Sequence, residues 1–200
     1  MAYTIGLTGN IACGKSTIGR ILVDCGADYI DTDAVVHNLL AEDSPQARQI
    51  LEQFGPEAAA PGGGINRAAL GAIVFRDAEK LRALERILHP AVEAIVEQRM
   101  KLTSAPVLMI DGVKIVESGF ADRMDALWVV TCSEEHQRAR LAEKRGMQPL
   151  DIEARLRSQP SLESKLARAD IVINNDGSLE DTERQVREAY SAVLKRLASA

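Results

Sequence analysis

The chain has 200 residues, of which 46% are hydrophobic and 26% are charged, as in ordinary globular proteins. It contains no run of about 18 apolar residues that would span a membrane, and its first residues lack the basic-then-apolar plan of a secretion signal. The formal charge of −5 argues against a general nucleic-acid-binding protein, and three cysteines are too few for a disulfide framework. We therefore expect a cytoplasmic protein without membrane or nucleic-acid partners.

The first third of the chain alternates between strand and helix patterns. The predicted elements are a strand at 3–8, a helix at 15–24, a strand ending at Ile30, a helix through Leu40 and a helix at 45–54. Residues 58–64 are predicted to form a loop, because Pro61-Gly62-Gly63-Gly64 holds regular structure poorly.

The pattern is almost entirely helical from 67 to 102, and Pro90 is expected to kink or restart that helix because proline lacks a backbone donor. The elements predicted after it are a strand at 107–110 ending at Asp111, a strand at 126–131, a helix from Ser133 to about Arg145, two helices within 150–168, a strand at 171–173 and a closing helix at 178–198. Strands that alternate with helices predict an α/β fold with a mainly parallel, five-stranded sheet and helices on both faces.

The helix-rich stretches are longer than simple crossovers between parallel strands require. We therefore expect one domain over residues 1–200, with a core at about 1–33, 103–137 and 169–200. Residues 34–102 are a candidate helical substrate-binding subdomain, and residues 138–168 are a candidate helical lid.

A phosphate-binding loop is the most specific motif. The segment Gly9-Asn10-Ile11-Ala12-Cys13-Gly14-Lys15-Ser16 matches G-x-x-x-x-G-K-[ST] at every fixed position and lies between a predicted strand and a predicted helix. Glycines let the backbone aim several N–H groups at one polyphosphate, and the helix N-terminus adds partial positive charge. Lys15 is expected to reach the β- and γ-phosphates, and the Ser16 hydroxyl to bind Mg²⁺. The dinucleotide-binding pattern G-x-G-x-x-G is absent.

Carboxylates follow the predicted strands. Asp31 and Asp33 come directly after the second strand, where the carboxyl ends of parallel strands face the ligand crevice. Such an acid can accept the proton of an attacking hydroxyl or hold the water shell of a metal ion, although Asp33 could instead cap the next helix. Asp111 ends the third strand like a Walker-B acid, and Glu117 is expected near the same edge.

The candidate lid is rich in arginine. Between residues 138 and 168, eight basic and four acidic side chains give a local charge of +4 in an otherwise acidic chain. Guanidinium groups pair bidentately with phosphate oxygens, so two or three of these arginines are expected to contact phosphate while the others face water.

Taken together, these residues resemble the dephospho-coenzyme A kinase family over nearly the whole chain. The matching segments are Leu7-Thr8-Gly9, Ile30-Asp31-Thr32-Asp33, Arg67-Ala68-Ala69-Leu70, Leu88-His89-Pro90, Asp111 through Gly119, Arg155 through Gln159, and Ala169 through Asn175. Their order and spacing are specific as a set. The resemblance implies a P-loop fold and ATP-dependent phosphorylation of the 3′-hydroxyl of dephospho-coenzyme A, the last step of coenzyme A biosynthesis.

The resemblance also implies roles for individual residues. Asp33 becomes the expected general base or hydroxyl-orienting group, Lys15, Arg138 and Arg145 the expected catalytic cations, and Asn175 lies near the adenine end of ATP. The nucleotide-binding set is Gly9, Asn10, Ile11, Ala12, Cys13, Gly14, Lys15, Ser16, Thr17 and Asn175; the substrate-binding set is Asp33, Arg67, His89 and Glu117. Arg67 and His89 could instead be structural, His89 as a hydrogen-bonded core histidine before Pro90. Mg²⁺ is expected on Ser16, with Asp31 reached through water. A monomer or a weak homo-oligomer is expected.

The chain departs from the family pattern at a few positions. Asn10 and Ala12 replace two loop glycines, and alanine would lose about 1 kcal/mol if its φ must be positive. Val113-Lys114-Ile115 replaces Pro-Leu-Leu, and Lys114 is expected to pair either with Glu117 or with a phosphate.

Two alternatives to this function stay open, namely another small-molecule kinase and a GTPase-like switch. The second is disfavoured because no Asn-Lys-x-Asp guanine reader is present. Cys13 is interpreted either as a small space-filling residue or as a redox-sensitive thiol at a helix N-terminus.

Overall fold

Strand β1 (Tyr3–Gly9) lies at the centre of a five-stranded sheet in the computed structural model, which describes residues 2–199 except the side chains of 144 and 145. The chain divides into two compact units, one formed by Met1–Ile30 with Thr103–Ala200 and the other by Asp31–Leu102. The sheet belongs to the first unit apart from the last residue of one strand.

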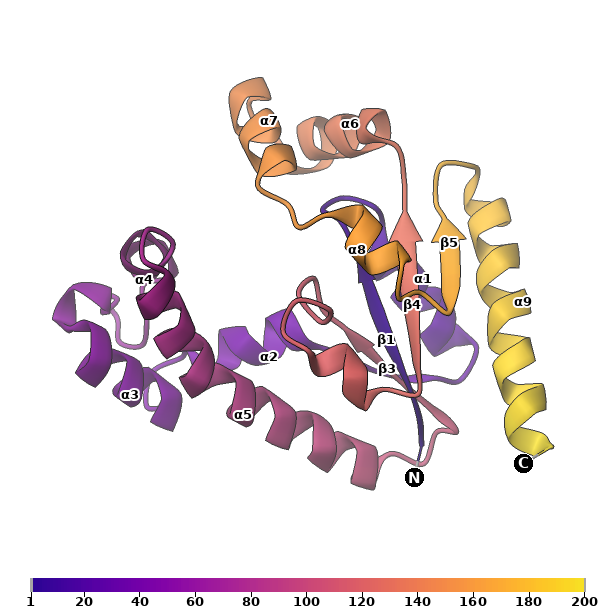
Figure 1. Cartoon of the computed structure of the whole chain (residues 1–200), viewed down its shortest axis with the longest axis horizontal. Helices are drawn as coiled ribbons and strands as arrows, with labels where there is room; N and C mark the ends of the chain where they lie inside the picture. Colours follow the sequence, from indigo (N-terminus) through magenta and orange to yellow (C-terminus); the bar gives the residue numbers. More distant parts are fainter. Residues whose placement is uncertain (1, 200) are drawn as a thin grey trace. The chain divides into compact units, whose positions relative to one another are not determined.

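The strand order places the phosphate loop at the centre of the sheet. The other strands are β2 (Asp28–Asp31), β3 (Val107–Asp111), β4 (Ala126–Thr131) and β5 (Ile171–Asn174), and the order is β2-β3-β1-β4-β5. Figure 1 labels β1, β3, β4 and β5. β1 pairs in parallel with β3 and β4, and β4 pairs in parallel with β5. The predicted α/β fold with a parallel five-stranded sheet is therefore confirmed.

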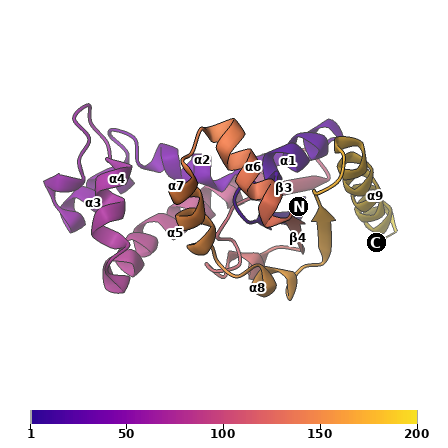
Figure 2. The ribbon, with the colours of Figure 1, turned by 90° about the horizontal axis from the view of Figure 1, so that it is seen from above.

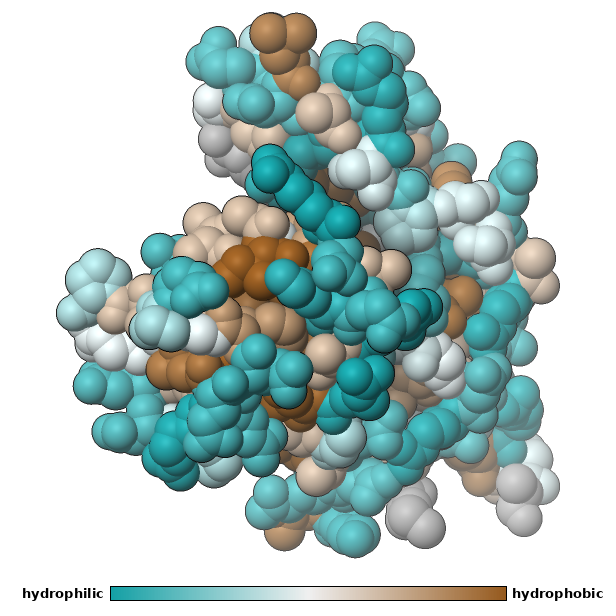
Figure 3. All heavy atoms as spheres, turned by 60° about the vertical axis from the view of Figure 1, so that its left-hand side comes forward, coloured by the Kyte–Doolittle hydropathy of each residue, from teal (hydrophilic) through white to brown (hydrophobic). Residues whose placement is uncertain are grey.

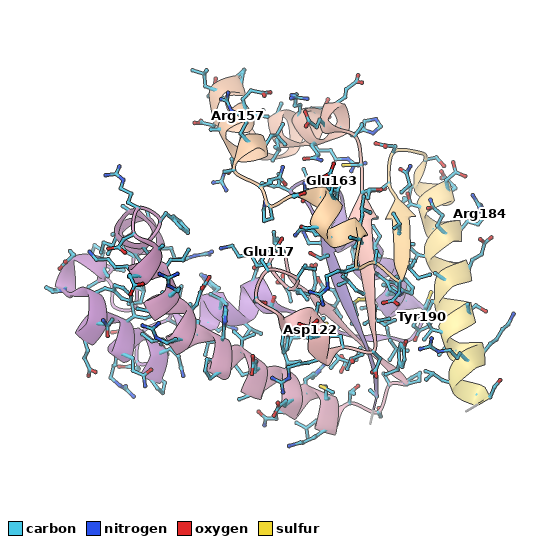
Figure 4. All side chains as sticks on the ribbon, viewed as in Figure 1. Glu117, Asp122, Arg157, Glu163, Arg184 and Tyr190 are labelled. Atoms are coloured by element: carbon cyan, nitrogen blue, oxygen red, sulfur yellow. The ribbon has the colours of Figure 1, made fainter. Side chains whose placement is uncertain are left out.

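Two helices pack against one another and against this sheet. α1 (Lys15–Asp24) buries Ile18, Ile21 and Leu22, at the i, i+3, i+4 spacing of an apolar helix face. α9 (Leu179–Ala198) buries Val186 and Tyr190 in the same core, and Figure 4 shows Tyr190 on the side of α9 that faces the sheet. The largest side chain of this core is Trp128 on β4, which is fully buried.

A second group of helices follows the carboxyl end of β4. α6 (Glu134–Arg145) begins at Ser133, whose hydroxyl accepts a hydrogen bond from the His136 amide, and ends at Gly146 with φ 60°. α7 (Pro149–Arg157) and α8 (Leu162–Leu166) come next, and the 3₁₀ turn η2 (Phe120–Arg123) precedes β4.

The second unit consists of helices around a separate core. They are α2 (Thr32–Leu39), α3 (Pro45–Phe54), the 3₁₀ turn η1 (Pro56–Ala58), α4 (Arg67–Val74) and α5 (Ala78–Leu102). α5 contacts α2, α3 and α4 (Figure 2), and the core includes Ile50, Phe54, Leu70 and Val74.

The expected restart at Pro90 is wrong, because α5 runs without interruption from Ala78 to Leu102. The break lies instead at residues 75–77, where the Asp77 carboxylate accepts hydrogen bonds from the Glu79 and Lys80 amides and starts a new helix. Pro90 has no N–H to donate to the carbonyl of Arg86, four residues earlier in the helix. Both residues are exposed, so water can take the place of this hydrogen bond.

Hydrophilic residues cover most of the face shown in Figure 3, and hydrophobic residues emerge there in separate patches. Within residues 2–199, none of the helices combines the length and the apolar character that crossing a bilayer requires.

Candidate active site

The phosphate loop connects the carboxyl end of β1 to the start of α1. Gly14 directly precedes α1 with φ 95°, and a Cβ at this position would lie 2.1 Å from Nδ2 of Asn175. Only glycine fits both the backbone conformation and the close contact. No side chain caps α1, so its first N–H groups and its positive dipole end are available to an anion.

Ala12 adopts the left-handed conformation that its glycine-like position demands. Its φ is 59°, which costs a non-glycine residue about 1 kcal/mol. Nη1 of Arg140 donates a hydrogen bond to the Ala12 carbonyl over 3.1 Å, and this contact helps to hold the strained peptide in place. Asn10, the other departure from the family's glycines, keeps a negative φ, and its buried Oδ1 has no hydrogen-bond partner in the described structure.

The functional side chains of the loop lie at its end. Lys15 is half-buried, and its Nζ lies 3.5 Å from the Gly9 carbonyl within the same loop. Ser16 is exposed on the first turn of α1, and the Thr17 amide donates to the Gly14 carbonyl over 2.9 Å. The Lys15 ammonium group, the Ser16 hydroxyl and the uncapped N–H groups therefore all lie at the N-terminal end of α1.

Asn175 packs against this loop from behind. Its Nδ2 donates to the Cys13 carbonyl over 2.6 Å, and its Oδ1 accepts from the Thr182 hydroxyl over 2.9 Å. The side-chain N–H and C=O groups of the buried Asn175 amide are therefore both hydrogen-bonded within the protein. The expected place of Asn175 near adenine stays a prediction.

Arg140 and Gln159 contact the loop although neither was singled out from the sequence. The Arg140 guanidinium bridges the Ala12 carbonyl and, over 2.9 Å, the Asn175 carbonyl. Oε1 of Gln159 accepts from the Ile11 amide over 2.5 Å. Arg140 is one of eight cations in its segment, and the sequence alone does not distinguish it from the others.

Arg138 is occupied by acidic neighbours. Its Nε lies 2.7 Å from Oε1 of Glu153, and its Nη2 lies 2.9 Å from Oε2 of Glu134. The hydrogen bond that Arg138 donates to Glu153 lowers the pKa of the Glu153 carboxyl below its usual value. To contact a phosphate, Arg138 would have to break its ion pairs with Glu134 and Glu153. The side chain of Arg145, the second expected lid arginine, lies outside the described residues.

Glu117 pairs with Lys165 and not with Lys114. Nζ of Lys165 lies 3.2 Å from Oε1 of Glu117, and it donates to the Val113 carbonyl over 2.5 Å and to the Thr8 hydroxyl over 3.4 Å. Glu117 lies in the loop after β3 (Figure 4), and Lys165 on α8 is fully buried. Burial lowers the pKa of Lys165, and the Glu117 charge opposes this shift.

The second unit carries the remaining candidates. Oδ1 of Asp31 accepts from the amides of Asp33 and Ala34 over 2.8 and 3.1 Å, so Asp31 is the cap of α2. The alternative that Asp33 is the cap is therefore wrong, and its carboxylate is exposed on the first turn. Arg67 is exposed at the start of α4, and His89 is half-buried on α5.

Asp111, the expected Walker-B acid, ends β3 and is buried. Its Oδ2 accepts a hydrogen bond from the Tyr29 hydroxyl over 2.7 Å. Among the described residues, no group of three or more histidine, cysteine or acidic side chains is arranged around a metal position.

The family model for dephospho-CoA kinase matches residues 3–181. The chain belongs to this family. A dephospho-CoA kinase from Symbiobacterium thermophilum is 43% identical over 94% of this chain and 80% of its own length. Another from Streptomyces avermitilis is 39% identical over 96% of this chain and 94% of its own length.

Solved structures agree with the family. A Thermus thermophilus protein has a TM-score of 0.83 at 33% identity, with 98% of both chains covered. Dephospho-CoA kinase from Campylobacter jejuni has a TM-score of 0.69 at 26% identity, also with 98% of both chains covered. A shikimate kinase from Acinetobacter baumannii has a TM-score of 0.57 at 16% identity, covering 98% of this chain and 95% of its own, and therefore shares the fold alone.

Proposed function

We propose that this protein transfers the γ-phosphoryl group of ATP to the 3′-hydroxyl of dephospho-coenzyme A, giving coenzyme A and ADP in the last step of coenzyme A biosynthesis. The phosphate loop, with Gly14 held in a left-handed conformation at the uncapped start of α1, is the observation that carries phosphoryl transfer. Family membership supports dephospho-coenzyme A as the acceptor.

The loop binds the nucleotide. Its amides and the positive end of α1 hold the phosphates, and Lys15 neutralises charge on the β- and γ-phosphate oxygens. These groups are aligned before the reaction, so they stabilise the transition state without having to reorganise. Arg140, Asn175 and Gln159 keep the loop in shape through their contacts with Ala12, Cys13 and Ile11.

The donor chemistry of Ser16 supports Mg²⁺, because its exposed hydroxyl on the first turn of α1 is a hard oxygen ligand. Asp31, whose Oδ1 caps α2, is proposed to contact the ion through water. Mg²⁺ binds through one or two protein oxygens plus substrate phosphates in such sites, and when bound it neutralises phosphate charge.

Asp33 positions the acceptor hydroxyl and takes up its proton. Its exposed carboxylate serves no cap, which leaves it available to substrate. Arg67, His89 and Glu117 are proposed to bind the acceptor, and Arg138 and Arg145 to contact the transferred phosphoryl group from a lid at 138–168. Residues 34–102 are proposed as the substrate-binding subdomain.

We propose a cytoplasmic enzyme that works as a monomer or a weak homo-oligomer with a small-molecule substrate and no nucleic-acid or membrane partner. Free thiols at all three cysteines support a reducing compartment. Size-exclusion chromatography with light scattering at several protein concentrations tests the oligomeric state.

The decisive experiment incubates the purified protein with Mg-ATP and dephospho-coenzyme A and detects coenzyme A by mass spectrometry. We expect a gain of one phosphate on the acceptor and equimolar ADP. A panel of nucleosides, nucleoside monophosphates and hydroxy acids, followed by coupled ADP release, separates this activity from that of another small-molecule kinase. Turnover of a panel compound without turnover of dephospho-coenzyme A would replace the proposal.

A further inference from the structure

The side chains of two cysteines are in contact at the phosphate loop. Cys13 belongs to the loop, and Cys132 follows directly after the last residue of β4. Their Sγ atoms are 3.1 Å apart, Cys13 is fully buried, and Cys132 is 7% exposed. Both are free thiols. The third cysteine, Cys25, lies elsewhere and accepts a hydrogen bond from Nη1 of Arg187 over 3.3 Å.

The surroundings of this pair favour one thiolate. The Cys132 thiol donates a hydrogen bond to Sγ of Cys13 and lowers the pKa of Cys13, and the cations Lys15 and Arg140 act in the same direction. Burial opposes this shift at Cys13. The hydrogen bond with Cys13, followed by burial, raises the pKa of Cys132. Because the thiolate is the nucleophile, Cys13 is the one expected to react first.

We propose that Cys13 and Cys132 form an oxidation site, at which hydrogen peroxide generates an intramolecular disulfide that weakens nucleotide binding. The Cys13 thiolate attacks one peroxide oxygen, the O–O bond breaks, and a sulfenic acid forms with release of hydroxide. The Cys132 thiol then attacks the sulfenic sulfur, and the hydroxyl group leaves as water with the thiol proton. The two sulfurs lose two electrons in total, and the peroxide is reduced to one water and one hydroxide ion, which becomes a second water by taking a proton from the solvent.

The disulfide affects the nucleotide through the geometry of the loop. A covalent bond is shorter than the present 3.1 Å separation, so Cys13 must move toward the end of β4. Its carbonyl is held by Asn175, and the preceding peptide is already strained at Ala12, so the movement shifts loop amides and not only the side chain. Misplacement of binding groups by about 1 Å reduces function by up to about 100-fold.

The same coupling works in the opposite direction. If the disulfide weakens ATP binding by a given factor, bound ATP disfavours the disulfide by that factor. Because Cys13 is fully buried, peroxide needs a transient opening of the loop, which bound nucleotide suppresses. A small oxidant such as hydrogen peroxide fits this restricted access.

The test compares the full chain after hydrogen peroxide with the same sample reduced again by dithiothreitol. We expect non-reducing peptide mass spectrometry to find the Cys13 and Cys132 peptides joined, with the loss of two hydrogen atoms. The affinity for a fluorescent ATP analogue should fall about tenfold or more and return on reduction. Mg-ATP present during the treatment should slow formation of the disulfide.

Matched variants separate the pair from other thiol chemistry. Cys132→Ser should bind the ATP analogue when reduced and keep its affinity after peroxide. Cys132→Val, which fills the site with an apolar side chain, should do the same. Cys25→Ser should lose affinity after peroxide like the wild type. Three results would overturn the proposal: no joined peptide, unchanged affinity once the peptides are joined, or equal inactivation of Cys132→Ser.

The inference rests on the nucleotide site of the proposed function but not on its acceptor. A reduced protein that binds ATP and phosphorylates dephospho-coenzyme A, yet forms no disulfide, refutes only the inference. A reduced protein that binds no nucleotide refutes the proposed function and, with it, the effect on affinity, although formation of the disulfide can still be measured.

Discussion

Ala12 holds a backbone conformation that glycine adopts without penalty. Its φ of 59° lies within a loop whose neighbouring residues are fixed from three directions by Arg140, Asn175 and Gln159. Strain of this kind persists where the surroundings determine the backbone, and such residues cluster at ligand-binding sites.

Ala12→Gly should therefore leave the free energy of unfolding unchanged or raise it by up to about 1 kcal/mol, because it removes the left-handed penalty. Ala142→Gly is the matched control, since Ala142 is an exposed residue inside α6 and glycine there costs about 1 kcal/mol. Urea denaturation of both variants measures the difference. Equal destabilisation would show that the positive φ at Ala12 carries no cost.

Asp33 is the residue on which the proposed chemistry depends most. Asp33→Asn should lower kcat by about 10² to 10⁴, the usual contribution of a general base, while leaving the affinity for ATP close to that of the wild type. The measurement pairs steady-state kinetics with titration of a fluorescent ATP analogue.

Asp43→Asn, an exposed acid of the same unit, serves as the control for lost negative charge. Turnover of Asp33→Asn that equals turnover of the control would remove Asp33 from the mechanism.

At the scale of elements, short polar contacts join segments that are distant in the chain. Lys165 on α8 reaches the loop after β3 at Val113 and Glu117, and the end of β1 at Thr8. Asp176, between β5 and α9, accepts hydrogen bonds from the Ser133 amide and the His136 ring, each over 2.7 Å, at the start of α6. These contacts hold the segments around the phosphate loop.

Lys165→Met should lower the free energy of unfolding by about 2 kcal/mol, because it leaves the Glu117 carboxylate and the Val113 carbonyl without their buried cation. Arg168→Met is the control, since its ion pair with Asp122 is exposed and should contribute less than about 1 kcal/mol. A cycle with Glu117→Gln measures the coupling directly. Equal losses in the two variants, with no coupling, would contradict a structural role for the Lys165–Glu117 pair.

Asp176 makes part of the stability depend on pH. The hydrogen bond from the Ser133 amide, followed by the interaction with His136, lowers the pKa of Asp176 below its ordinary value. A carboxyl with a lowered folded pKa contributes stability above its unfolded pKa and loses it as the pH falls through the folded value.

The stability difference between the wild type and Asp176→Asn should therefore be present at pH 6 and shrink at about pH 2, because it is lost as the pH falls through the lowered folded pKa. Since the side chain is 38% exposed, we expect no more than about 1 kcal/mol. Thermal melts at both pH values check this. A difference that persists in acid would assign it to packing and not to charge.

For the whole molecule, the phosphate loop lies in one of two compact units, and each unit has its own hydrophobic core. A ligand that binds only the folded state stabilises the unit that holds it, by about 2.7 kcal/mol at 100 times its dissociation constant. The residues that bind the phosphates should therefore determine which unit responds to nucleotide.

Mg-ATP should raise the melting temperature and protect the amides of residues 3–30 and 107–143 from hydrogen exchange, and Lys15→Ala should largely abolish both effects. Lys101→Ala, an exposed lysine in the last turn of α5, should retain them. Differential scanning fluorimetry and hydrogen-exchange mass spectrometry provide the two measurements. A full ligand response in Lys15→Ala would exclude Lys15 from phosphate binding.

Local sequence patterns determined most elements, because helix and strand periodicities and turn residues act over a few positions. The helices at 15–24 and 45–54 and the strand at 126–131 occur at the predicted residues. Pro90 shows the limit of this reasoning: an exposed proline can be accommodated within a long helix, while the Asp77 cap decides where α5 begins.

The phosphate loop can be predicted from the sequence because its functional residues are consecutive, from Gly9 to Ser16. Tertiary structure decided the contacts that support it, since Arg140, Gln159 and Asn175 reach the loop from segments more than 100 residues away. It also paired Glu117 with Lys165 and brought Cys132 against Cys13. A sequence pattern states which side chains are present, but their partners follow from the order of the strands and the packing of the helices around them.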